Sequence, residues 1–171
     1  MPPLQQFQRT RYFSGRMLSA EDLQREQDYH RDKGRLHNRL LHGWGVVDGL
    51  QVSVDRGSIV LSPGVALDCA GHELVLPDPV RLPLPRRAGR YVLTLRYTET
   101  AVDPSPDPDG GMPPGAIREE VAVELCDRHP APRHPRPGPP GCGEAHALGL
   151  ATVTRRGARW AVTPLKVRLR G

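Results

Sequence analysis

Cysteine and histidine residues stand at both ends of a proline-rich segment, at spacings typical of metal ligands. Cys126 is followed by His129, and Cys142 is followed by His146. Two such pairs supply the thiolate and imidazole ligands of a tetrahedral structural zinc, which would also hold together a segment too rich in proline to fold alone. The alternative is that this spacing arose by chance, since no Cys-x-x-Cys pair accompanies it. Apart from this structural zinc, we expect no cofactor.

Three further histidines, His30, His37 and His42, lie in a polar segment that is predicted to be helical. His30 and His37 are two helical turns apart, roughly 10 Å along the axis, which is too far for them to share one ion. We therefore interpret these histidines as surface or contact residues rather than as a catalytic set.

Sequence patterns that would identify an enzyme are missing. The chain has no G-x-S-x-G, P-loop or H-E-x-x-H motif, and its segment HGWGVVDG lacks the glycine spacing and the following helix of a dinucleotide-binding loop. Asp48 and Asp68 stand near glycines, where aspartate commonly stabilises turns. The sequence therefore predicts a protein without catalytic activity.

Composition narrows the classes of protein further. The 171 residues suffice for one domain, and 19 prolines and 18 glycines favour many short elements joined by turns. The net charge of +5 comes from arginines scattered along the chain, so we expect no nucleic-acid binding. No apolar stretch has the length of a membrane span or the character of an export signal, so we expect synthesis in the cytoplasm. Three cysteines do not indicate a disulfide framework.

A capped helix is predicted over residues 19 to 42, after an extended N-terminal arm over residues 1 to 18 that ends in a turn at Ser14 and Gly15. Ser19 and Asp22 have the spacing of a capping box, and acidic residues precede basic ones as the helix dipole favours. The helix has few apolar residues, so it can rest only a narrow stripe, formed by Tyr29, Leu36 and Leu40, on a sheet or on a neighbouring subunit.

The rest of the chain, residues 43 to 171, is predicted to be a β domain. It contains roughly eight to ten short apolar segments bounded by glycine or proline, as in a sandwich or barrel. One of them, RYVLTLRYT, alternates in the manner of a strand. Candidate strands include 58–62, 65–69, 72–76, 80–84, 90–98, 117–126, 147–154, 159–163 and 165–170. Of these, 147–154 and 159–163 are expected to form a hairpin around Arg156 and Gly157. Two proline-rich loops, 99–116 and 127–144, are expected to pack no core. The predicted fold class is mainly β with one long N-terminal helix.

Residues 11 to 76 carry a series of short patterns in a fixed order. They are an aromatic-x-Gly-x-x-Leu lead, a capped helix with Glu-Gln and Tyr, a Gly-x-Gly-Val-Val-x-Gly-Leu segment, and a Pro-Gly-x-Ala-x-Asp-x-x-Gly strand pair. The residues are Phe13, Gly15, Leu18, Asp22, Glu26, Gln27, Tyr29, Gly43, Gly45, Val46, Val47, Gly49, Leu50, Pro63, Gly64, Ala66, Asp68 and Gly71. The combination resembles a recurring module of phage-tail and contractile-injection-system gene clusters. The resemblance implies a structural subunit of a tail-like particle, associated with the baseplate or a tail fibre.

We therefore expect an assembly subunit, present in multiple copies, that binds other subunits of the particle into which it is incorporated. The residues expected to contact partners are Tyr12, Phe13, Tyr29, His30, His37, Arg39 and Trp44. One alternative is a receptor- or carbohydrate-binding module of a tail fibre, which predicts exposed aromatic residues on loops. Another is a zinc-dependent enzyme that uses the Cys/His cluster, which predicts stoichiometric metal.

Overall fold

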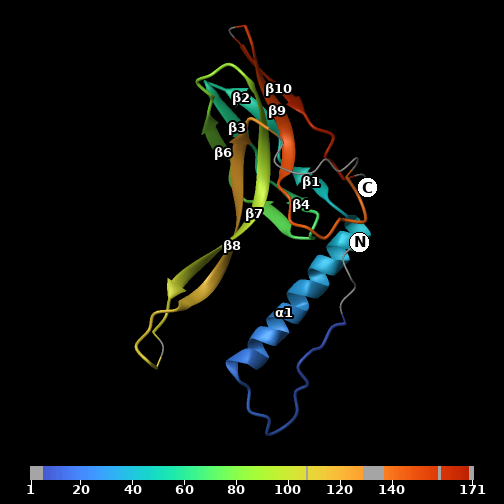
Figure 1. The fold of residues 1–171 in the computed structure, drawn as a ribbon, viewed down its shortest axis with the longest axis vertical. Coiled ribbons are helices and arrows are strands. Elements are labelled where there is room, and N and C mark those ends of the chain that lie inside the picture. The colour runs from blue at the N-terminus through green and yellow to red at the C-terminus, as the bar shows by residue number, and fades with distance from the viewer. Residues whose placement is uncertain (1–5, 107, 129–136, 158, 170–171) are drawn as a thin grey trace.

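A computed structural model of the chain describes residues 6–169 apart from residues 107, 129–136 and 158. In this structure the protein is mainly β, with one helix near the N-terminus (Figure 1). The predicted fold class is confirmed. No helix in the described part of the chain is both long enough and apolar enough to cross a membrane.

The helix α1 spans Ala20–His37 and continues as a π-helical turn, η1, over Asn38–His42. Both halves of the predicted capping box are present: the Ser19 hydroxyl accepts from the Asp22 amide at 3.2 Å, and the Asp22 carboxylate accepts from the Ser19 amide at 3.5 Å. Gly43 ends the helical segment at a φ of 78°, a conformation that glycine adopts without strain.

Among the described residues, ten strands form three antiparallel sheets. The first sheet has the order β1-β4-β5, with β1 at Gly45–Gly49, β4 at Gly64–Leu67 and β5 at Glu73–Leu76. The second has the order β2-β3-β6, with β2 at Val52–Asp55, β3 at Ser58–Leu61 and β6 at Val80–Pro83. The third has the order β10-β9-β7-β8, with β7 at Arg90–Pro104, β8 at Pro114–Cys126, β9 at Leu148–Arg156 and β10 at Arg159–Pro164.

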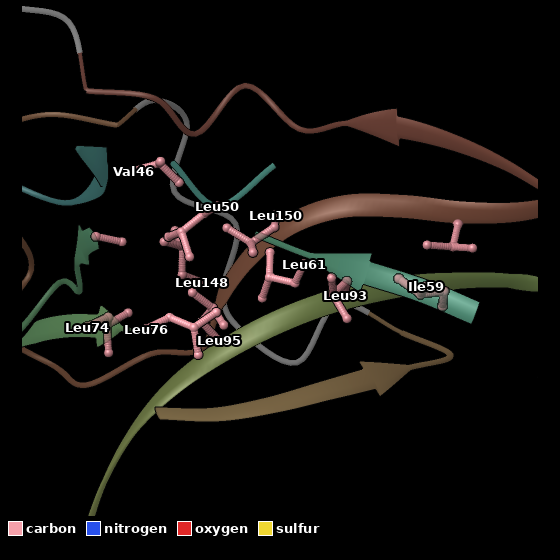
Figure 2. Close-up of a cluster of buried hydrophobic side chains, with 12 residues drawn as sticks. Val46, Leu50, Ile59, Leu61, Leu74, Leu76, Leu93, Leu95, Leu148 and Leu150 are labelled. Atoms are coloured by element: carbon pink, nitrogen blue, oxygen red, sulfur yellow. The ribbon is translucent and has the colours of Figure 1, made fainter. Parts of the chain in front are cut away.

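One hydrophobic core joins the three sheets. Leu74 from β5, Ile59 and Leu61 from β3, and Leu93 and Leu95 from β7 are each at most 1% exposed. Figure 2 shows these side chains pointing into a shared interior together with others from β1 and β9. Because the alternating apolar residues of separate strands meet there, the body is stabilised by the burial of apolar surface from all three sheets.

Two predicted segments differ in the structure. The loop expected at residues 99–116 is largely a hairpin, because β7 and β8 stay paired from Val92↔Cys126 out to Pro104↔Pro114. The backbone N–H and C=O groups of the two strands hydrogen-bond to each other along this hairpin, and this pairing does not depend on core residues. The strand expected at residues 165–170 is absent from its described part, where Arg168 forms an isolated bridge with Val46. The second predicted loop, 127–144, lies partly outside the described residues.

Candidate docking site on the helix and arm

The helix α1 projects away from the sheets instead of covering one of them. None of its residues is buried, and Figure 1 shows it leaving the body beside the hairpin of β7 and β8. Its predicted apolar stripe, Tyr29, Leu36 and Leu40, is only half-buried. A helix that keeps this much surface in solvent is available to a partner, because tertiary packing of an apolar face normally supplies most helical stability.

The N-terminal arm folds back along this helix. The Phe7 ring meets the Tyr29 ring edge-on, with centroids 6.2 Å apart, and the Lys33 ammonium lies 5.3 Å from the Phe7 centroid. The buried Thr10 donates its hydroxyl proton to the carbonyl of Asp22 at 3.2 Å. The described part of the arm is therefore packed on α1. The sequence predicted an extended arm but did not predict these contacts.

A second set of contacts shapes the turn between the arm and the helix. The Arg16 guanidinium donates to the Asp22 carboxylate at 2.7 Å and to the Arg11 carbonyl at 2.8 Å. The chain turns at Ser14 and Gly15, as the sequence predicted. These contacts hold the turn in one conformation.

Large apolar side chains are exposed around this turn. We define the apolar tip as Tyr12, Phe13, Met17, Leu18 and Leu23, which are 52%, 64%, 92%, 48% and 53% exposed. Their clustering within twelve consecutive positions, on a segment fixed by the Arg16 contacts, distinguishes them from the scattered apolar residues of an ordinary surface. An exposed apolar cluster of this kind indicates an interaction site.

The other end of the helix is held to the sheets through a glycine. Gly71, in the turn between β4 and β5, has a φ of 94°, and a Cβ added there would lie 2.2 Å from the Arg35 carbonyl oxygen. The Asn38 amide donates to the Gly71 carbonyl at 3.1 Å and to the Glu73 carboxylate at 3.2 Å. The helix backbone therefore touches the turn directly, and only glycine leaves room for it.

The same turn is organised by a buried carboxylate. Asp68, 2% exposed, accepts hydrogen bonds from the Ala70 amide at 2.9 Å and from the His72 amide at 2.8 Å. Its other oxygen lies 2.6 Å from the His72 Nδ1. The imidazole then stacks on the Tyr97 ring of β7, with centroids 4.2 Å apart and planes 4° from parallel. Asp68 thus places His72 for a contact with the sheet.

A polar groove of about 240 Å³ lies between the helix and the sheets at this end. It is lined by His30, Arg31, Gly34, Arg35, Asn38, Gly71, His72, Glu73, Tyr97 and Glu119. The Asp68 and His72 pair has the form of the orienting pair of a catalytic triad, but these lining residues include no serine, threonine or cysteine to act as a nucleophile. The hydrogen bonds of Asp68 to its own turn account for its burial.

Beside the groove, a hydrogen bond and an ion pair join the helix to the hairpin. The Tyr97 hydroxyl donates to the Glu99 carboxylate at 2.7 Å, and the Arg35 guanidinium lies 3.4 Å from the same carboxylate and over the Tyr97 ring. The hydrogen bond from Tyr97 lowers the pKa of Glu99 below its ordinary value, since it favours the charged form. Burial, together with this acceptor, raises the pKa of Tyr97.

Replacing Tyr97 with phenylalanine is expected to raise the pKa of Glu99 towards its ordinary value. The substitution removes the hydrogen bond that is the largest cause of the depressed pKa and leaves the stacking ring in place. The measurement is an NMR titration of the glutamate carboxyl carbons. Tyr91→Phe is the matched control, because the Tyr91 hydroxyl donates to the Arg87 carbonyl and not to a carboxylate. An unchanged Glu99 titration would contradict the assignment.

The predicted partner-contact residues lie in different surroundings. Tyr12 and Phe13 belong to the apolar tip, and Tyr29 is half-buried beneath Phe7. His30 is exposed, with Nε2 3.2 Å from the Glu26 carboxylate.

The remaining predicted contacts lie near the base of the helix. The Nε2 atoms of His37 and His42 are 3.2 Å apart on the exposed side of the last turns. Arg39 is half-buried, and its carbonyl accepts from the Gly141 amide at 2.8 Å. Trp44 packs against the hydrophobic core, so the structure gives it a role inside the protein.

The predicted metal ligands are brought together only in part. Cys142 Sγ lies 3.2 Å from the His146 Nε2, while Cys126 lies at the end of β8, 3.9 Å from the Thr94 hydroxyl. His129 lies outside the described residues. Within the part of the chain that the structure describes, no group of three or more histidine, cysteine or acidic residues could hold a metal ion. Zinc therefore gains no support from this geometry.

Cys142 has a further contact that the sequence did not predict. The Cys142 amide donates to the Cys69 Sγ at 3.5 Å, although the two residues are far apart in the chain. Burial raises the pKa of the Cys69 thiol to about 12, so this cysteine stays protonated at neutral pH. No local pattern links these two cysteines, whereas Met17 and Leu18 could have been noticed as apolar residues in a polar arm.

No protein-family model matches the chain, and no curated protein matches it. The described residues form a mainly β protein with a projecting helix and arm. The apolar tip is the largest group of neighbouring exposed apolar side chains described above.

Proposed function

We propose that this protein is a non-catalytic assembly subunit of a contractile phage-tail-like particle, in its baseplate or fibre-attachment region. The observation that carries the proposal is the apolar tip, five exposed large side chains on the turn held by Arg16 and on the start of α1. Surface of this kind is covered by a partner in an assembled particle. Residues 11 to 76 resemble a module of phage-tail and contractile-injection-system gene clusters, and this resemblance is the reason for proposing a phage-tail-like particle.

The rigid attachment of the helix supports the same role. The close contact of Gly71 with the helix backbone and the bonds of Asn38 fix the base of α1. The arm contacts fix its far end, so the tip is presented at a set position relative to the sheets. Preorganised contacts cost less conformational entropy on association than flexible ones.

The double variant Phe13→Ser/Met17→Ser is expected to reduce incorporation into particles by about tenfold or more. Burying a large apolar side chain contributes roughly 1.5–3 kcal/mol, and about 1.4 kcal/mol corresponds to tenfold in affinity. Incorporation is measured by quantifying the subunit in purified particles. Because both side chains are more than half exposed, the thermal stability of the isolated subunit should not change.

The matched control is Val75→Ser, since Val75 is 52% exposed on β5, away from the tip. It should incorporate like the unaltered protein. Full incorporation of the double variant would overturn the proposed docking role of the tip.

A further inference from the structure

The hairpin of β7 and β8 is a second projection with its own exposed apolar residues. β9 pairs with β7 only between Arg90 and Leu95, so beyond this point β7 and β8 form a two-stranded ribbon. Ile117 and Met112, on the ribbon and its connecting loop, are 60% and 62% exposed. A two-stranded ribbon is marginally stable in water by itself, so one of this length is expected to be covered.

The hairpin and the arm carry opposite charge. Residues 99–120 contain six acidic residues and one basic residue, whereas residues 1–18 contain three arginines and no acidic residue. Arg9 and Arg11 are exposed beside the apolar tip. The arm therefore combines exposed apolar side chains with positive charge, the hairpin combines them with mainly negative charge, and the two signs are complementary.

These two surfaces lie on separate projections of the molecule. The base of α1 is fixed to β7 by the Arg35 and Glu99 pair and to the β4–β5 turn by Gly71 and Asn38. From this base the helix and the hairpin extend in the same general direction, and Figure 1 shows the arm turn and the hairpin end as two separate ends. In this structure a contact between them therefore involves two copies.

We propose that the apolar tip and the arm arginines of one copy bind the β7–β8 hairpin of a second copy. This proposal rests on the proposed assembly role, because it names a second copy of the chain as the partner that the apolar tip binds. Each copy offers both surfaces, so the contact joins unlike patches and builds either a closed set of copies or an extended row. The apolar residues supply affinity, and the charges set the orientation.

Charge reversal in two separate variants tests the contact. The arm variant is Arg9→Glu/Arg11→Glu, and the hairpin variant is Asp109→Lys/Glu120→Lys. Self-association is measured on the full chain by sedimentation equilibrium. Each variant alone is expected to bind itself about tenfold or more weakly than the unaltered protein, because like charges then face each other. An equimolar mixture of the two is expected to regain association, since an acidic arm then meets a basic hairpin.

The matched control is Arg86→Glu/Arg87→Glu, which makes the same charge change at an exposed turn before β7. It should associate like the unaltered protein. The proposal is overturned if the unaltered protein stays monomeric at every concentration, if the arm variant is no weaker than this control, or if the mixture gains nothing.

Failure here is separable from failure of the assembly role. An unaltered protein that is monomeric yet enters particles overturns the contact between copies and leaves the assembly role standing. If association recovers in the mixture but the protein never enters particles, the contact between copies is supported and the proposed assembly role is contradicted.

Discussion

Replacing Gly71 with alanine is expected to destabilise the protein by about 3 kcal/mol and to loosen α1 from the sheets. The added Cβ would lie 2.2 Å from the Arg35 carbonyl oxygen, a backbone atom that moves only if the helix or the turn moves. The φ of 94° adds strain for any side chain. The free energy of unfolding is measured by urea denaturation, and helix loosening by faster proteolysis within α1.

Gly57→Ala separates the two causes. Gly57 has a φ of 77°, and a Cβ added there has nothing within 4 Å. The free energy of unfolding of this variant should therefore fall only by the cost of placing alanine at a positive φ, about 1 kcal/mol. Equal losses in both variants would show that the close contact between the helix and the turn contributes nothing to stability.

Replacing Asp68 with alanine is expected to cost about 3 kcal/mol. The amides of Ala70 and His72 would lose their acceptor in a partly buried turn, and His72 would lose the carboxylate that holds its ring on Tyr97. Asp68→Asn keeps one acceptor oxygen for the two amides and should lose less. Chemical denaturation gives the free energies of unfolding, and the ring-current shifts of Tyr97 report whether the stack persists.

The control for this variant is Asp55→Ala. Asp55 is exposed and forms an ion pair with Arg81 at 3.2 Å, a surface pair of the kind that contributes about 0–1 kcal/mol. If Asp68→Ala cost no more than Asp55→Ala, the buried carboxylate would not be what organises the turn.

These two positions give a physical meaning to the pattern Pro-Gly-x-Ala-x-Asp-x-x-Gly. Within it, Ala66 is fully buried, Asp68 organises the turn and Gly71 admits the helix. Gly64 is equally constrained, because a Cβ there would lie 2.4 Å from the Asp48 carbonyl oxygen of β1. The pattern therefore specifies the β4–β5 turn, which contacts the base of the helix. Neither aspartate near these glycines, Asp48 or Asp68, needs a catalytic role to explain its place.

The sequence by itself determined the helix, its cap and the mainly β character of the rest. These features depend on residues close together in the chain: Ser19 caps an amide three positions away, and apolar residues alternate within single strands. The turn at Gly157 between β9 and β10 was found for the same reason. The extent of β7 was not, because prolines and acidic residues suggest a loop, while the backbone pairing with β8 needs no core residues.

Only the tertiary structure decided the site. Arg35 and Glu99 are 64 positions apart, and nothing in the local pattern of either predicts the other. The stack of His72 on Tyr97 and the contact of Cys142 with Cys69 likewise join segments that are far apart in the sequence and meet in the folded protein. The position of Tyr12 and Phe13 depends on Arg16 bending the arm back to Asp22. Side chains of these types are common, and their partners are chosen by the packing of the whole chain rather than by neighbours in sequence.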